Sequence, residues 1–204
     1  MGKTTKRDLR KQILETCRDF LVEEGFGRMS MRKIARKVGV TATSIYLHFQ
    51  NKDELLHTLI DETIEELNAH LEAAAQLKGS PREQLLNLAQ AYVDFAMQNP
   101  GKYQIVYQVR ADEMGRYPKE KFRKARRGYK LVSSIIRESN KDGQIREMAP
   151  DMAAYVFWAQ LHGLMSVVLS KRLDVRVSQE AFIEKGLAQI VKGLGYDDPE
   201  DCEF

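Results

Sequence analysis

Cysteine is scarce in this chain of 204 residues, which contains only Cys17 and Cys202. Two cysteines are too few for the disulfide-dense scaffold of a small secreted protein, and too few for a four-cysteine metal site. Composition alone still allows one disulfide bridge. We expect instead two free thiols, as is usual in a reducing cytoplasm.

The sequence also lacks the motifs of common enzyme classes. It has no G-x-S-x-G, no glycine-rich phosphate loop and no H-E-x-x-H. One E-x-x-H occurs, from Glu54 to His57, but di-iron helical bundles need two such motifs and two further glutamates. We therefore expect no enzymatic activity, no cofactor and no metal site.

Long apolar runs are absent with one exception, the 19 residues from Met152 to Ser170, which carry no formal charge. This length is close to the ~20 residues that span a bilayer, but a helix that is apolar all round also fits burial in a protein core. At the N-terminus, Asp8 and Arg10 stand where the apolar part of a signal peptide would begin. We predict a cytoplasmic protein with no membrane attachment.

Positive charge is concentrated near the N-terminus. Residues 1–50 contain eleven lysines and arginines against five acidic residues, a net charge of +6, whereas the rest of the chain has a net charge of −3. A basic segment on a mildly acidic body is typical of a protein that binds a polyanion at one end, although charge alone fits a solvated surface equally well. Residues 196–204 form a short acidic tail.

Apolar residues recur at three- and four-residue intervals along most of the chain, which predicts an all-α protein. Leu9, Ile13 and Leu21 form one such stripe before Gly25, which suits a helix end. Ser80 and Pro81 are typical of a helix start. About nine helices are predicted, at residues 6–24, 30–37, 41–49, 51–77, 81–98, 99–108, 118–140, 150–171 and 178–194.

The segment from Ser30 to Phe49 has the pattern of a helix-turn-helix motif. Two short helices, each preceded by a hydroxyl residue that can cap it, flank Gly39, which can adopt a positive φ at the turn. The second helix has small or hydroxylated side chains near its N-terminus, as suits insertion into the major groove of DNA. The candidate base-contacting residues are Thr41, Ala42, Thr43 and Ser44.

This segment resembles the recognition region of the TetR family of bacterial transcriptional regulators, approximately G-V-[ST]-x-x-x-[LI]-Y-x-[HY]-F-x-[SN]-K-x-x-L. Residues 39–55 are G-V-T-A-T-S-I-Y-L-H-F-Q-N-K-D-E-L, so almost every fixed position matches. The resemblance covers residues 6 to about 66. Thr43 departs from the pattern, since many relatives have glycine there, and this difference bears on base recognition rather than on the fold.

The resemblance implies further DNA contacts. Tyr46, His48 and Lys52 match family positions that contact the DNA backbone. Ser30 and Arg32 lie at the start of the preceding helix, where free N–H groups favour phosphate. Basic residues at the N-terminus are expected to form either an arm that touches DNA or a solvated tail; these are Lys3, Lys6 and Arg7.

The C-terminal half, residues 81–194, resembles a TetR subclass with an N-P-x-x-Y segment and a W-x-x-x-H-G pattern, here Asn99–Tyr103 and Trp158–Gly163. Large side chains at helical spacing are typical of a core, but helices of this kind can also enclose an apolar ligand pocket. The predicted ligand-contacting residues are Tyr92, Phe95, Tyr103, Tyr107, Phe122, Trp158 and His162. We interpret the basic run at 119–130 as a solvated helix face, and the alternative is that it attracts an anionic effector or an acidic partner.

The sequence thus predicts a ligand-responsive repressor that binds a pseudo-palindromic operator in double-stranded DNA. We expect a homodimer formed through residues 151–171 and 178–194, and release from DNA by a small, mainly apolar or aromatic effector. The predicted organisation is a DNA-binding domain at 1–50, a connecting helix at 51–78, and a larger ligand-binding and dimerisation domain at 79–195. Two alternatives stay open: a TetR-like DNA binder controlled by a protein partner or by no ligand, and a helical-bundle enzyme or carrier that binds no DNA.

Overall fold

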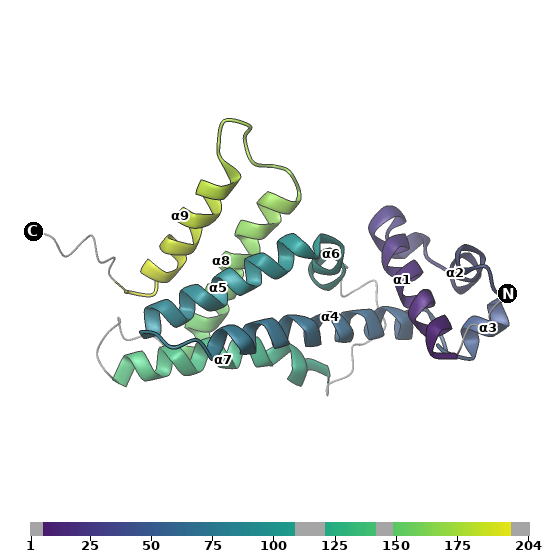
Figure 1. The fold of residues 1–204 in the computed structure, drawn as a ribbon, viewed down its shortest axis with the longest axis horizontal. Coiled ribbons are helices and arrows are strands. Elements are labelled where there is room, and N and C mark those ends of the chain that lie inside the picture. Colours follow the sequence, from purple (N-terminus) through teal and green to yellow (C-terminus); the bar gives the residue numbers. More distant parts are fainter. Residues whose placement is uncertain (1–5, 109–120, 142–148, 197–204) are drawn as a thin grey trace, which may run out of the picture. The chain divides into compact units, whose positions relative to one another are not determined.

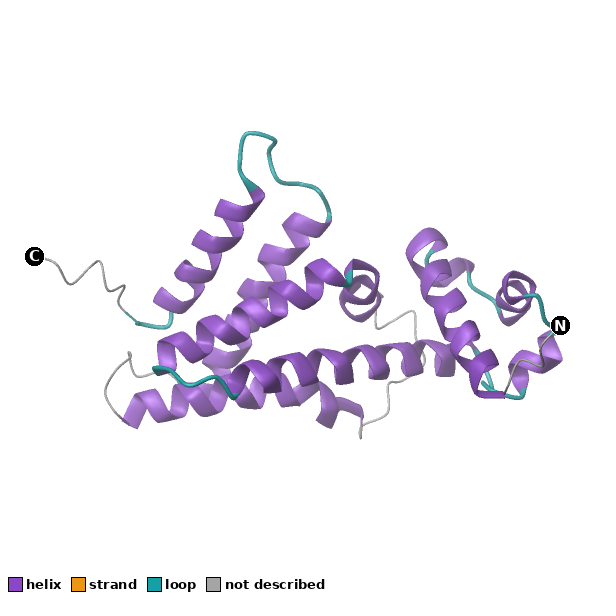
Figure 2. Cartoon of the chain, viewed as in Figure 1, coloured by secondary structure: helices purple, strands orange, loops and turns teal. Residues whose placement is uncertain are grey.

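The computed structural model describes residues 6–108, 121–141 and 149–196, and within these ranges the chain is helical and has no strand (Figures 1 and 2). The all-α prediction is therefore confirmed. The described ranges contain nine α-helices and one short 3-10 helix: α1 (Lys6–Glu24), η1 (Phe26–Arg28), α2 (Met31–Val38), α3 (Ala42–Tyr46), α4 (Lys52–Ala75), α5 (Pro81–Gln98), α6 (Pro100–Gln108), α7 (Lys121–Lys141), α8 (Pro150–Leu169) and α9 (Gln179–Lys192).

Side-chain caps explain why several helices start where the sequence predicts. Before α5, the Ser80 hydroxyl accepts a hydrogen bond from the Glu83 N–H (3.3 Å), and the Glu83 carboxylate accepts one from the Ser80 N–H (2.7 Å). The pair satisfies two N–H groups at a helix start. Because both the N–H and the hydroxyl of Ser80 donate to it, the Glu83 carboxyl has a pKa below its usual value. Ser178 caps α9 by accepting from the Ala181 N–H (3.3 Å).

The helices group into two compact units. The first unit contains α1, α2, α3, α6 and the part of α4 up to Glu65. The second contains α5, α8, α9, α4 from Glu66 onward and α7 from Ala125 onward. The helix α4 therefore contributes to both units along its length.

In the first unit, α6 packs against α1. A Cβ atom on Gly101 would lie 3.2 Å from Val22 Cγ2, so the glycine permits this close approach. Tyr103 of α6 is almost completely buried. The residues that follow the N-P dipeptide thus belong to the same unit as the helix-turn-helix, a grouping that the sequence pattern did not predict.

In the second unit, α5, α8 and α9 pack on one another. A Cβ atom on Gly186 of α9 would lie only 2.6 Å from Leu164 Cδ1 of α8, so the glycine leaves room for this leucine side chain, which would have to shift for a larger residue. Leu161 and Met165 of α8 are fully buried. These contacts make α8 a central helix of this unit.

One face of α8 is nevertheless exposed in the single chain. Within the described ranges, α8 is the one helix that is long and apolar enough to cross a membrane, but a core helix passes the same test, so this is weak evidence. Only 39% of its most apolar stretch is buried. Met152, Tyr155 and Val156 are 61%, 54% and 43% exposed. In a single copy of the chain, α8 is therefore only partly buried, whereas the sequence predicts a fully buried helix.

Cys17 in α1 is fully buried, and its Sγ lies 3.3 Å from the Sδ of Met29. Burial raises the pKa of this thiol to about 12, so the thiol stays protonated and unreactive near neutral pH. In a Cys202→Ser variant, iodoacetamide at about pH 8 is expected to leave the folded protein unmodified and to alkylate Cys17 fully after unfolding in urea. Rapid alkylation of the folded variant would contradict this burial.

Candidate nucleic-acid interface and effector site

The helices α2 and α3 form a helix-turn-helix, as the sequence predicts. The Ser30 hydroxyl accepts a hydrogen bond from the Lys33 N–H (3.3 Å) at the start of α2. Gly39 ends α2 with a φ of 82°, in the left-handed region that glycine occupies without steric penalty. The N–H groups of Gly39 and Val40 both donate to the Ala35 carbonyl, at 2.9 and 3.0 Å. The chain consequently turns tightly from α2 into α3.

A small apolar core lies behind the turn. Ile34 and Ala35 of α2 and Ile45 of α3 are buried, with 0%, 3% and 0% of their surface exposed. Phe49, which follows α3, is also buried. Because this core fixes α2 against α3, the outer face of α3 is held on a rigid support.

Capping engages two of the four predicted base-contacting residues. The Thr41 hydroxyl oxygen accepts a hydrogen bond from the Ser44 N–H (3.2 Å) and lies 2.9 Å from the Ser44 hydroxyl. Ala42 is half-buried, whereas Thr43 is exposed. Thr43, the residue that departs from the family pattern, is therefore the side chain of this set that projects most freely from α3.

The predicted backbone-contacting residues lie at the end of α3 and the start of α4. Tyr46 is 54% exposed and His48 is half-buried. Lys52 is the first residue of α4, and its Nζ lies 4.3 Å from the centre of the Phe26 ring. A cation–π contact of this kind positions the ammonium group without removing its charge.

The start of α4 is capped by side chains on both sides of Lys52. The Asn51 side-chain oxygen accepts a hydrogen bond from the Glu54 N–H (2.8 Å). The Glu54 carboxylate accepts one from the N–H of Gln50 (2.6 Å), one residue before the cap. Lys52 is thus held at a helix start, where backbone N–H groups favour an anion.

Some cations of the basic N-terminal segment are paired within the protein. Lys37 Nζ lies 2.9 Å from Glu23 and 3.5 Å from Glu24, and the hydrogen bond to Glu23 raises its pKa. Arg10 Nη1 lies 3.1 Å from the Glu62 carboxylate. Glu23 and Glu24 are already counted in the net charge of residues 1–50, so only the pairing of Arg10 with Glu62, which lies outside this segment, lowers the charge that the segment offers to DNA.

Arg32 is exposed on α2. Of the predicted N-terminal arm, Lys3 lies outside the described residues. Lys6 and Arg7 begin α1, but their side chains are also outside the described part of the structure. The arm therefore stays a prediction.

The predicted ligand-contacting residues fall in both units. Tyr103 and Tyr107 of α6 belong to the first unit, where their ring centres lie 5.0 Å apart. Phe122 is on α7, but its side chain lies outside the described residues. The members in the second unit are Tyr92, Phe95, Trp158 and His162.

Trp158 is the centre of an aromatic cluster in the second unit, which we call the Trp158 cluster. Its ring centre lies 5.2 Å from that of Tyr92, 5.7 Å from that of Phe157 and 5.9 Å from that of Tyr129. Tyr155 extends the cluster through a contact of 4.6 Å with Tyr129. Burial, reinforced by Tyr155, raises the pKa of Tyr129, so its hydroxyl stays neutral. Tyr129, Tyr155 and Phe157 were not among the predicted ligand-contacting residues.

His162 and Phe95 lie elsewhere in the same unit. His162 is half-buried on α8, and burial lowers its pKa, which favours the neutral imidazole near pH 7. Phe95 is buried and packs edge-on against His70 of α4, with ring centres 5.5 Å apart. Phe95 is therefore part of the apolar interior of the second unit, and His162 is a mainly neutral side chain on α8.

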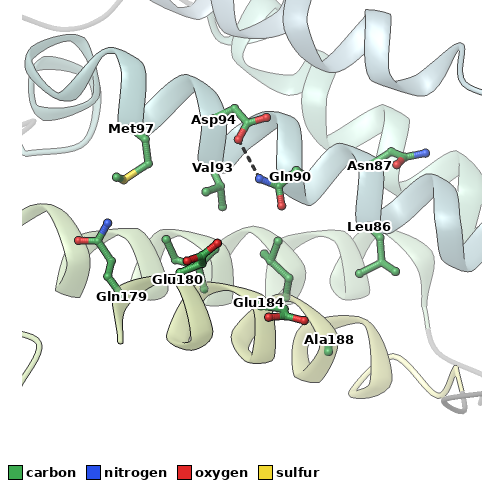
Figure 3. Close-up of a pocket in the computed structure, with 12 residues that line it drawn as sticks. Leu86, Asn87, Gln90, Val93, Asp94, Met97, Gln179, Glu180, Glu184 and Ala188 are labelled. Carbon is green, nitrogen blue, oxygen red and sulfur yellow. Dashed lines mark hydrogen bonds between the residues drawn. The ribbon is translucent and has the colours of Figure 1, made fainter. Parts of the chain in front are cut away.

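A groove of about 750 Å³ lies between α5 and α9 (Figure 3). Its lining combines apolar side chains with three carboxylates and three amides, and it includes no lysine or arginine and none of the predicted ligand-contacting residues. Gln90 donates a hydrogen bond to Asp94 (2.8 Å) on one edge. The lining residues are Leu86, Asn87, Gln90, Val93, Asp94, Met97, Gln179, Glu180, Ile183, Glu184, Leu187 and Ala188.

In the described part of the basic run at 119–130, two cations form ion pairs with acidic side chains. Arg127 donates to the Glu72 carboxylate through Nε (2.8 Å), and Lys124 Nζ lies 3.8 Å from Glu65. Both acidic partners are on α4. Arg123, Arg126 and Lys130 are exposed.

Two family models match the chain. The model of bacterial regulatory proteins of the tetR family matches residues 13–59, which include the helix-turn-helix. The model described as the tetracyclin repressor-like C-terminal domain matches residues 85–190, more than half of the chain.

Individual relatives agree with these matches. A fatty acid metabolism regulator protein of Bacillus subtilis (strain 168) is 24% identical over 143 residues, which are 70% of this chain and 73% of that protein. A tetR-family regulatory protein from Rhodococcus RHA1 has a similar structure, with a TM-score of 0.77, 17% identity and coverage of 97% and 100% of the two chains. A fatty acid degradation regulator from Bacillus halodurans has a TM-score of 0.73 and 19% identity, over 97% and 99% of the two chains.

Proposed function

Because the chain belongs to the tetR family of bacterial regulatory proteins, we propose that it is a repressor that binds a pseudo-palindromic operator as a homodimer and dissociates when a small effector binds. One arrangement carries the proposal: a rigid helix-turn-helix in which exposed Thr43 and Tyr46 lie on α3 and Lys52 begins α4. A helix with short exposed side chains fits the major groove, while cations beside it bind the phosphate backbone.

Lys52→Ala is expected to weaken binding to every DNA sequence about three- to tenfold. The change removes one phosphate contact, so the slope of log affinity against log salt concentration should fall by about one. Gel shifts at several salt concentrations measure both quantities. Lys78→Ala, which removes an exposed lysine after α4, is the matched control and should leave the slope unchanged.

Thr43→Val is expected to change sequence preference rather than overall affinity. The substitution keeps the shape of the exposed side chain but removes its hydroxyl, so affinity should change up to about tenfold at one or two base pairs. Binding to a set of operators with single-base substitutions measures the effect. Equal losses on all of these operators and on random DNA would assign Thr43 to backbone contact instead.

We propose that the homodimer forms through α8 and α9. Val156, Gln160, Gly163 and Val167 are spaced by four, three and four residues and so lie on one face of α8. This face carries no charged residue, and in the single chain Val156, Gln160 and Gly163 are exposed while Val167 is half-buried. A twofold-related copy would bury it, as is usual for the apolar interface of an obligate dimer.

We propose further that the effector binds at the Trp158 cluster rather than in the groove between α5 and α9. The similarity to regulators named for fatty acid metabolism suggests a ligand with an acyl chain. Asp94, Glu180 and Glu184 would repel an anionic end group in the groove. The rings of the Trp158 cluster offer neutral apolar area to such a chain.

A further inference from the structure

The indole N–H of Trp158 is buried and has no hydrogen-bond acceptor within the described part of the chain. Trp158 as a whole is only 8% exposed. Buried polar groups in proteins are nearly always paired, because an unpaired donor loses the hydrogen bonds that water would provide. An unpaired donor at this position therefore needs an explanation.

The indole ring of Trp158 has aromatic neighbours and packs closely against α7. The indole lies against the backbone of α7, where a Cβ atom on Gly128 would come within 3.2 Å of Trp158 Cζ2 and 3.1 Å of Leu71 Cδ1. Tyr92 approaches its ring at 66°. Arg127, the residue before Gly128, donates to Glu72, so its charge is compensated. These contacts therefore offer no uncompensated cation to an anion buried beside the indole.

We propose that Trp158 Nε1 donates a hydrogen bond to a neutral carbonyl oxygen of an otherwise apolar effector, an inference that rests on the proposed effector site at the Trp158 cluster. A neutral donor in apolar surroundings pairs well with an ester, thioester or ketone oxygen. An ionised carboxylate would lose its hydration there without gaining a cation. The site therefore selects a neutral acyl derivative over the corresponding free acid.

Calorimetric titration with three probes of similar chain length tests this selectivity. Methyl decanoate is expected to bind the full-length wild type about tenfold more tightly than undecane, which has no acceptor. Decanoate is expected to bind more weakly than the ester. Trp158 is the sole tryptophan of the chain, so a change in its emission reports binding at the site itself.

Trp158→Phe keeps an aromatic ring but removes the N–H. In this variant the advantage of methyl decanoate over undecane is expected to fall to about twofold or less. Tyr196→Phe, which removes a hydroxyl group outside the Trp158 cluster in the same unit, should keep the full advantage. Because the readout is a ratio between two ligands, a general loosening of the core cannot imitate it.

Three results would overturn the inference. They are equal affinity of the wild type for ester and undecane, tighter binding of decanoate than of the ester, and an ester advantage that survives Trp158→Phe. The proposal of ligand control is tested independently of the role of Trp158. It fails if no apolar compound that binds the protein alters the affinity of the protein for DNA. A compound that releases DNA without changing Trp158 emission would preserve ligand control but reject Trp158 as its donor.

Discussion

Replacing Val167 with arginine is expected to convert the dimer to a monomer and to abolish operator binding. Val167 is half-buried in the single chain and continues the uncharged face of α8, so in the proposed twofold dimer each new guanidinium would be buried close to its symmetry mate. An unpaired buried charge destabilises a contact by about 3–5 kcal/mol, which raises the dimer dissociation constant roughly 10²- to 10³-fold or more. Because both half-sites must be occupied together, a monomer should bind the operator no better than random DNA.

Light scattering at micromolar protein concentration and gel shifts measure the two parts of this prediction. Val167→Ala should remain dimeric, since it adds no charge. Gln98→Arg adds the same charge at an exposed position at the end of α5 and should also remain dimeric. If Val167→Arg stays folded, dimeric and able to bind the operator, the proposed interface on α8 is wrong.

An effector that binds the second unit is expected to loosen operator binding about 5- to 150-fold, equivalent to a coupling of about 1–3 kcal/mol. It can do so only if it binds the conformation without DNA more tightly than the conformation on DNA. The helix α4 is the physical link we propose, because it starts at Lys52 beside α3 and contributes to both units. A tilt of α4 would change the spacing of the two recognition helices, and the fixed spacing of DNA grooves penalises that change.

A thermal-shift screen with fatty acids, acyl esters and aromatic compounds identifies binders, and gel shifts with each binder then measure release. Trp158→Ala should weaken both effects together, because it removes the centre of the Trp158 cluster. Compounds that stabilise the protein but leave its operator affinity unchanged, in the wild type and in this variant, would refute ligand control and leave DNA binding intact.

The fold and the helix-turn-helix could be predicted from sequence because short-range rules determine them. Ser30 and Thr41 cap their helices through the residue three positions later, and Gly39 takes the positive φ that its place in the pattern indicates. The predicted span of the first helix, residues 6–24, agrees with α1. Each of these features depends on neighbours within about four residues.

Features set by residues far apart in sequence could not be predicted in the same way. The pairing of Lys37 with Glu23 and the contact of α6 with α1 depend on how helices pack. The groove between α5 and α9 is formed by two helix faces about 90 residues apart in the sequence, such as those that carry Val93 and Ile183. Periodicity indicates that those faces exist, but it does not say which helix each one meets.

The central claim, sequence-specific DNA binding by a dimer, is tested most directly by footprinting the purified protein on promoter fragments in the presence of excess random DNA. We expect protection of a pseudo-palindromic site whose half-sites lie about one helical turn or a multiple of it apart, with affinity at least about 10³-fold above that for random DNA. Binding should saturate at a whole number of dimers per site. A protein that binds no promoter fragment more tightly than random DNA would contradict the account.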